Sequence, residues 1–235
     1  MSREQFGGAS KAGSSLLSPL ERRLSRRAVP HIPAWLETYH LTMLTLAWSA
    51  LVVLFGYLAR GDRRWLWASS AMVVCQYLTD HFDGKVGRAR GTGLVKWGFY
   101  MDHLLDYVFL ASLLAGYAFI LPERAHLHLL LVLAVAGGFM VNSFLSFAAT
   151  GRFHISHLRM GPTEFRLAIV VLNALLVAYG PRRMEKALPY VAAVGLALLC
   201  VLVYRTQREI WRRDMADKAR AERARETFVA HREAA

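Results

Sequence analysis

The sequence has few cysteines and few charged residues, and each shortage excludes a class of protein. Only two cysteines occur among 235 residues, Cys75 and Cys200, and both lie inside apolar runs, which excludes a disulfide framework and a cysteine-rich metal site. Charged residues make up 20% of the chain against 55% hydrophobic ones, a balance that excludes an ordinary soluble domain. Acidic residues are scarcer than basic ones, 17 against 29, so the net charge is +12.

The basic residues are interspersed between apolar stretches, and this spacing favours a membrane protein with basic cytoplasmic flanks. A nucleic-acid-binding protein would instead gather its basic residues on one folded face, so we expect no nucleic-acid partner. The first thirty residues lack the continuous apolar segment and the small-residue cleavage site of a signal peptide. We expect them to form a flexible basic arm.

Six near-continuous apolar runs predict an all-α integral membrane protein with six transmembrane helices. A helix needs about 20 residues to cross a bilayer, so the two shorter runs are expected to continue as helix into the adjoining polar sequence. The runs comprise residues 41–59, 65–79, 104–121, 127–149, 167–180 and 188–204.

Most of the 29 Lys and Arg residues fall on one side of the predicted bundle, in both terminal segments and in the stretches 80–103 and 152–166. The positive-inside rule therefore predicts that both termini and these two stretches are cytoplasmic. The predicted organisation is a basic cytoplasmic arm at 1–34, a six-helix membrane domain at 35–206 and a charged cytoplasmic helix at 207–235.

Four aspartates stand at the junctions of the second and third apolar runs. Asp80 and Asp83 are three positions apart and Asp102 and Asp106 are four apart, so each pair projects from one face of a helix. Acidic residues at membrane depth usually face a cavity and mark a functional site. If the two helices lie side by side, the four carboxylates meet and require compensating positive charge. Oxygen ligands favour a hard divalent ion such as Mg²⁺ or Mn²⁺, which commonly binds substrate phosphates.

A glycine-rich basic stretch, 84–93, separates the two aspartate pairs, and we expect it to be a loop. Glycines let the backbone approach a ligand closely, and Lys85, Arg88 and Arg90 can neutralise phosphate oxygens. Many cytoplasmic loops are basic for topological reasons alone, so the composition of this stretch does not by itself indicate a site. With an aspartate pair on each side, it predicts a diphosphate-binding site.

The stretch 80–106 resembles the signature of the CDP-alcohol phosphotransferase family, D-x-x-D-G-x-x-A-R followed, after a short spacer, by G-x-x-x-D-x-x-x-D. The chain departs from it at Gly87, where the family usually has alanine, a change between two small residues. The matching residues are Asp80, Asp83, Gly84, Arg88, Gly98, Asp102 and Asp106.

The resemblance implies a role for each matched position. Asp80, Asp83 and Asp102 are expected to bind two divalent ions, Mg²⁺ or Mn²⁺, and Asp106 to act as general base beside them, also near the metal. The CDP-binding surface is expected to comprise Gly84, Lys85, Gly87, Arg88 and Gly98.

The resemblance also implies the reaction and the partners. An acceptor hydroxyl attacks the β-phosphate of a CDP-linked alcohol, either CDP-diacylglycerol or a CDP-polar alcohol, and CMP leaves. One of donor and acceptor is a lipid, and the product serves phospholipid biosynthesis. Members are often homodimers, and a basic chain of this kind suits a bacterial inner membrane with the active site facing the cytoplasm.

Other interpretations stay open at this point. Glu164 and Arg166 could hold the acceptor, or they could belong to an ordinary basic cytoplasmic loop. An intramembrane prenyltransferase also binds a diphosphate through aspartates and Mg²⁺, but it uses two spaced aspartate motifs on separate repeats. A cation transporter or a non-catalytic scaffold could use the carboxylates alone, although it would leave the Gly-Arg stretch without a role.

Overall fold

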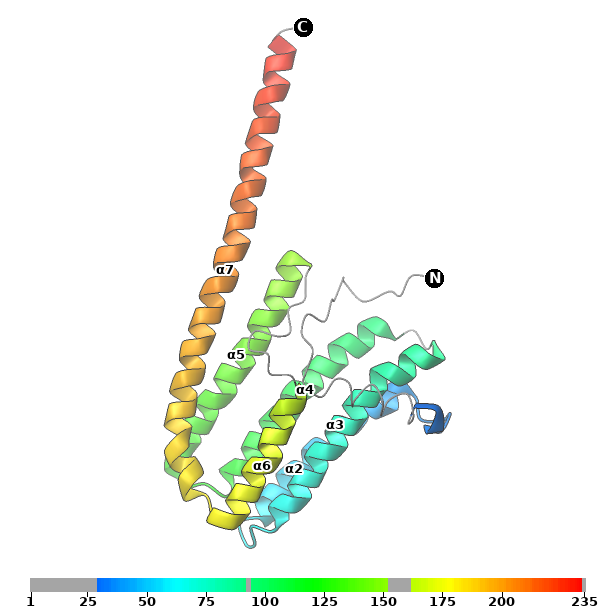
Figure 1. The fold of residues 1–235 in the computed structure, drawn as a ribbon, viewed down its shortest axis with the longest axis vertical. Helices are drawn as coiled ribbons and strands as arrows, with labels where there is room; N and C mark the ends of the chain where they lie inside the picture. The colour runs from blue at the N-terminus through cyan, green and yellow to red at the C-terminus, as the bar shows by residue number, and fades with distance from the viewer. Residues whose placement is uncertain (1–28, 92–93, 152–161, 234–235) are drawn as a thin grey trace.

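A computed structural model describes residues 29–91, 94–151 and 162–233, and this part of the chain is helical with no strand (Figure 1). Each helix contains one of the six predicted apolar runs, apart from a few residues at the ends. The helices are α2 (Thr38–Leu58), α3 (Trp65–Arg90), α4 (Val95–Ala118), α5 (His126–Thr150), α6 (Pro162–Tyr179) and α7 (Arg182–Glu233), with short 3-10 helices η2 (Val29–His31) and η3 (Glu123–Ala125).

Three segments of the described chain are long and apolar enough to cross a membrane: α2, the stretch Glu123–Thr150 that includes α5, and Arg182–Thr227 of α7. The helices α3, α4 and α6 carry polar or charged residues near their ends, which lowers their mean hydropathy. The all-helical architecture predicted from the sequence is thus confirmed. As expected, the short second run continues as helix into the polar sequence that follows it.

The expectation of a loop at 84–93 is wrong for most of that stretch, because α3 continues through Arg90. It ends at Gly91, whose φ of 67° is left-handed and whose N–H donates to the carbonyl of Gly87. A glycine inside a helix costs about 1 kcal/mol relative to alanine. Burial of Val86 and the bonds that Arg90 makes to the segment before α2 offset this cost.

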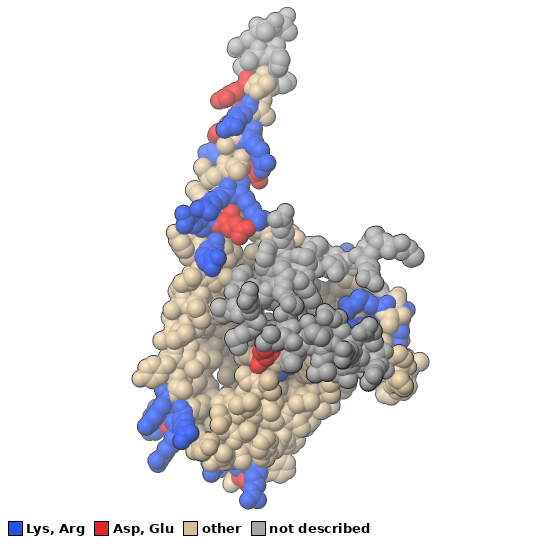
Figure 2. Space-filling model, in the orientation of Figure 1, with Lys and Arg blue, Asp and Glu red and all other residues tan. Residues whose placement is uncertain are grey.

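Helix α2 packs against both α3 and α4, and these are the most extensive helix contacts in the described residues. Helix α6 packs on α3, and α5 packs on α7. The connections α2–α3, α4–α5 and α6–α7 lie together at one end of the molecule in Figure 1, and the charged half of α7 projects beyond the other end. Lys and Arg gather near both ends and along this projection, while the visible face between them is largely uncharged (Figure 2).

The crossing of α2 and α4 depends on two glycines. A Cβ placed on Gly56 would lie 2.4 Å from the Cα of Gly116, and one on Gly116 would lie 3.2 Å from the carbonyl oxygen of Val52. The two backbones therefore touch without intervening side chains. Small residues allow this close approach between membrane helices, where dispersion contacts rather than water drive association.

A buried polar network fixes α6 on its neighbours. Asn173 of α6 is fully buried, its Nδ2 donates to Ser70 Oγ of α3 at 3.0 Å, and its Oδ1 accepts from the Tyr117 hydroxyl of α4 at 2.8 Å. Each of these polar atoms would be costly to bury without a partner. Arg166, two turns earlier on α6, is buried as well. The network therefore sets the rotation of α6 that turns Arg166 toward α3 and α4.

Candidate active site

Three of the four signature aspartates meet between α3 and α4. Carboxylate oxygens of Asp80, Asp102 and Asp106 lie within 4.8 Å of one another, and all three side chains are half-buried. The pair on each helix is brought to this point by α2, which packs on both α3 and α4. The interpretation that two helical aspartate pairs converge is therefore correct for three of the four carboxylates.

Asp83 is buried beside this cluster and is held by α2. Its Oδ2 accepts a hydrogen bond of 2.9 Å from Thr42 Oγ1, and its Oδ1 accepts one from the backbone N–H of Gly84. Thr38 Oγ1 donates to the backbone carbonyl of Asp83 at 3.2 Å. Each carboxylate oxygen has more than one lone pair, so these hydrogen bonds leave Asp83 able to bind a cation as well.

A buried arginine supplies the positive charge that the carboxylates require. Arg166 Nη2 lies 2.8 Å from Asp80 Oδ2 and 3.3 Å from Asp106 Oδ1, so one guanidinium bridges α3 and α4. Its Nε donates to Gln76 Oε1 at 2.7 Å, and Gln76 Nε2 donates to Asp106 Oδ1 at 3.3 Å. Arg166 thus lies at the carboxylates. Glu164, its companion in the predicted acceptor site, lies in the first turn of α6.

A cavity of about 370 Å³ opens next to the cluster, a size within the usual range for small-ligand sites. The signature glycines and Arg88 form one part of its wall, two aspartates another, and apolar side chains of α4 a third. The lining comprises Thr38, Asp83, Gly84, Gly87, Arg88, Gly91, Leu94, Val95, Gly98, Phe99, Asp102 and His103. A Cβ on Gly98 would meet no atom of the described residues within 4 Å, so a side chain at this position would take up open space between them.

The three basic residues between the aspartate pairs have different surroundings. Arg88 is exposed and lines the cavity. Lys85 Nζ lies 3.1 Å from His81 Nδ1 and is not among the lining residues, so its part in CDP binding stays a prediction. The guanidinium of Arg90 donates at 2.8 to 3.3 Å to backbone carbonyls of the segment before α2, which it ties to the end of α3. These carbonyls belong to Ile32, Pro33, Ala34 and Leu36.

Two contacts of the site were missed from the sequence. Gln76 carried a signal, because it is an amide inside an otherwise apolar run and one helical turn before Asp80, and polar residues in such runs usually face the protein interior. The hydrogen bond from Thr42 to Asp83 could not be predicted from the sequence, because the two residues are far apart along the chain and only the packing of α2 on α3 joins them.

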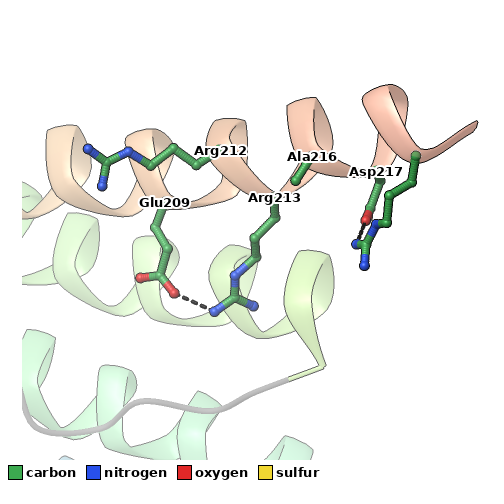
Figure 3. Close-up of a pocket in the computed structure, with 6 residues that line it drawn as sticks. Glu209, Arg212, Arg213, Ala216 and Asp217 are labelled. Atoms are coloured by element: carbon green, nitrogen blue, oxygen red, sulfur yellow. Dashed lines mark hydrogen bonds and ion pairs between the residues drawn. The ribbon is translucent and has the colours of Figure 1, made fainter. Parts of the chain in front are cut away.

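A second, larger hollow lies on the projecting part of α7, but it offers no comparable site. Figure 3 shows that its charged side chains all come from this one helix, with Glu209 paired to Arg213. Asp217 likewise pairs with Arg220 on the same helix. Such ion pairs along a solvated helix stabilise it by a few tenths of a kcal/mol each. Among the described residues, no other element forms a second wall that could enclose a ligand there.

The helices and the signature residues described above also match a known protein family. The profile of the CDP-alcohol phosphatidyltransferase family matches residues 39–203, which include all the signature residues and five helices with most of the apolar part of α7. The chain belongs to this family. A comparison with curated proteins gives no significant match.

CDP-alcohol phosphatidyltransferases are transferases that depend on a divalent metal, and the cluster fits such an ion. Its donors are carboxylate oxygens alone, the ligand type that hard divalent cations prefer, and they come from two helices packed on a common third. The apolar helices and the family together make this chain an integral membrane protein.

Proposed function

We propose that this phosphatidyltransferase moves a substituted phosphate group from a CDP-alcohol to the hydroxyl of an acceptor alcohol, releasing CMP, in phospholipid biosynthesis. The observation that carries this proposal is that Arg88 and the signature glycines line one cavity with Asp83 and Asp102. A diphosphate bound there would lie beside the carboxylate cluster. The donor is CDP-diacylglycerol or a CDP-polar alcohol, and one of the two substrates is a lipid.

Asp80, Asp83, Asp102 and Asp106 would hold two divalent ions, Mg²⁺ or Mn²⁺, which when bound would neutralise the diphosphate and the leaving CMP. The chain's own residues would make the remaining contacts with the donor. Gly84, Gly87 and Gly98 leave room for the nucleotide, and Arg88 donates to phosphate oxygens.

Asp106 accepts the proton of the acceptor hydroxyl as that oxygen attacks the β-phosphate. The oxygen forms its new bond to phosphorus while the bond to the CMP oxygen breaks. Glu164 and Arg166, near the start of α6, are proposed to contact the acceptor, since α6 brings Arg166 within 3.3 Å of Asp106. A positioned base of this kind contributes about 10² to 10⁴ in rate.

The six helices are proposed to cross a bacterial inner membrane with both termini and the active site on the cytoplasmic side. The distribution of Lys and Arg supports this orientation, because most of them lie in the two terminal segments and in the stretches 80–103 and 152–166. The charged part of α7 would then extend into the cytoplasm, and we propose a homodimer as the assembled form.

The reaction class is tested by CMP release from detergent-purified protein, supplied with Mg²⁺ or Mn²⁺, CDP-diacylglycerol or CDP-linked alcohols, and a panel of acceptor alcohols. We expect CMP only in the presence of a particular acceptor and a divalent ion. CDP or CMP with Mg²⁺ should also raise the unfolding temperature, because a ligand at about a hundred times its Kd stabilises the folded state by about 2.7 kcal/mol. If folded protein neither releases CMP nor is stabilised by CDP or CMP with Mg²⁺, the result would favour the prenyltransferase or the transporter interpretation.

Replacing Arg88 by methionine should raise the KM for the CDP-alcohol about tenfold to a hundredfold, because a hydrogen bond to a charged group contributes about 1.5 to 3 kcal/mol. The kcat should change little, since Arg88 lies on the nucleotide side of the site. Lys96→Met is the matched control, because Lys96 is an exposed basic residue on α4 that does not line the cavity. Equal effects of the two variants would show that net charge alone attracts the donor.

A further inference from the structure

Gln76 is 1% exposed and lies behind the carboxylate cluster, where the proposed reaction gives it no role. Its amide makes a bond at each end. Nε2 donates to Asp106 Oδ1 at 3.3 Å, and Oε1 accepts from Arg166 Nε at 2.7 Å. Arg166 Nη2 donates to the same Asp106 Oδ1 at 3.3 Å, which closes a ring of three side chains.

The partners dictate which way the amide faces. A guanidinium can only donate hydrogen bonds and an ionised carboxylate can only accept them, so the oxygen of Gln76 must face Arg166 and its nitrogen must face Asp106. A glutamine is long enough to span both partners and has a neutral acceptor and a neutral donor at its tip. An aliphatic side chain of the same length would make neither bond.

Both donors of the ring go to Oδ1 of Asp106, and Oδ2 takes no part in it. Two bonds converging on one oxygen hold the carboxylate by that atom and leave the lone pairs of Oδ2 for a bound divalent ion and a reacting group. Arg166 alone would hold it loosely, because Nη2 is shared with Asp80 and lies closer to that residue, at 2.8 Å. Gln76 is the partner that Asp106 does not share with Asp80.

We propose that Gln76 is a positioning residue that orients the Asp106 carboxylate so that Oδ2 meets the acceptor hydroxyl. This inference rests on the proposed function, in which Asp106 takes the hydroxyl proton. Misplacing a reacting group by about 1 Å can cost about a hundredfold in rate. Gln76 acts through Asp106 and lies outside the residues that line the nucleotide cavity, so its loss should affect the chemical step and leave donor binding intact.

The test compares Gln76→Met with Val73→Ala. Methionine keeps the length of the side chain and removes both hydrogen bonds. Val73 is fully buried on the same helix one turn earlier and packs in an apolar cluster, so its truncation weakens the fold without touching Asp106. The measurements are kcat and KM for CMP release, together with the rise in unfolding temperature on adding CMP and Mg²⁺.

For Gln76→Met we expect kcat to fall about tenfold to a hundredfold, with the KM for the donor within about twofold and the CMP and Mg²⁺ stabilisation retained. Val73→Ala should lower the unfolding temperature and leave kcat near that of the parent protein. Gln76→Asn, which keeps the amide but is too short to span both partners, should show the same loss of kcat and serves if the methionine variant does not fold.

An unchanged kcat in the folded Gln76 variants of an active parent protein would overturn this inference alone. So would a loss of kcat that is accompanied by an equal loss of CMP-dependent stabilisation, because that pattern indicates a purely structural role. A parent protein that releases no CMP with any donor and acceptor would instead overturn the proposed function, and this inference with it.

Discussion

Replacing Asp106 by asparagine should lower the rate of CMP release by about 10² to 10⁴, the usual contribution of a positioned general base. Asparagine has the same shape, and its carbonyl oxygen can still accept from Gln76 and Arg166, so the ring behind the cluster can persist. The variant removes the group that accepts the proton with little disturbance of packing. The check is steady-state CMP release with saturating donor, acceptor and Mg²⁺, beside the unfolding temperature without ligand.

The matched control is Asp62→Asn. Asp62 lies in the connection between α2 and α3, at the opposite end of the molecule, where its Oδ1 accepts from the backbone N–H of Arg64 at 2.9 Å. The same change of charge at this position should leave CMP release unchanged. If Asp106→Asn is folded and retains CMP release within about tenfold of the parent protein, another group takes the proton and the role given to Asp106 is wrong.

The sequence predicted the fold well because its strongest signals are local. Apolar runs predicted the helices, and helical spacing predicted that Asp102 and Asp106 share a face. The sequence was less informative where contacts join distant segments. The bonds from Thr42 to Asp83 and from Gln76 to Asp106 depend on how helices pack, and the helical state of 84–90 depends on tertiary contacts that outweigh the low helix propensity of glycine.

The geometry of the site also depends on the contact between Gly56 and Gly116, which lies away from the carboxylates. Helix α2 positions the cluster because it packs on both α3 and α4, and its crossing with α4 has Gly56 against Gly116. Replacing Gly56 by leucine would place a side chain where even a Cβ lies 2.4 Å from backbone, so α2 and α4 must separate. Overpacking of this kind typically costs about 1 to 3 kcal/mol, and a clash with backbone places the expected cost at the upper end or above.

We therefore expect Gly56→Leu to lower the unfolding temperature and the yield of folded protein, and to reduce CMP release in the molecules that do fold. The second effect follows because Asp102 and Asp106 move with α4, whereas Asp80 and Asp83 stay with α3, which also packs on α2. Gly61→Leu is the control, because a Cβ on Gly61 has its nearest neighbour at an ordinary 3.7 Å. Thermal unfolding and CMP release per folded molecule check both parts. Full stability and activity in Gly56→Leu would show that the contact between α2 and α4 does not set the distance between the two aspartate pairs.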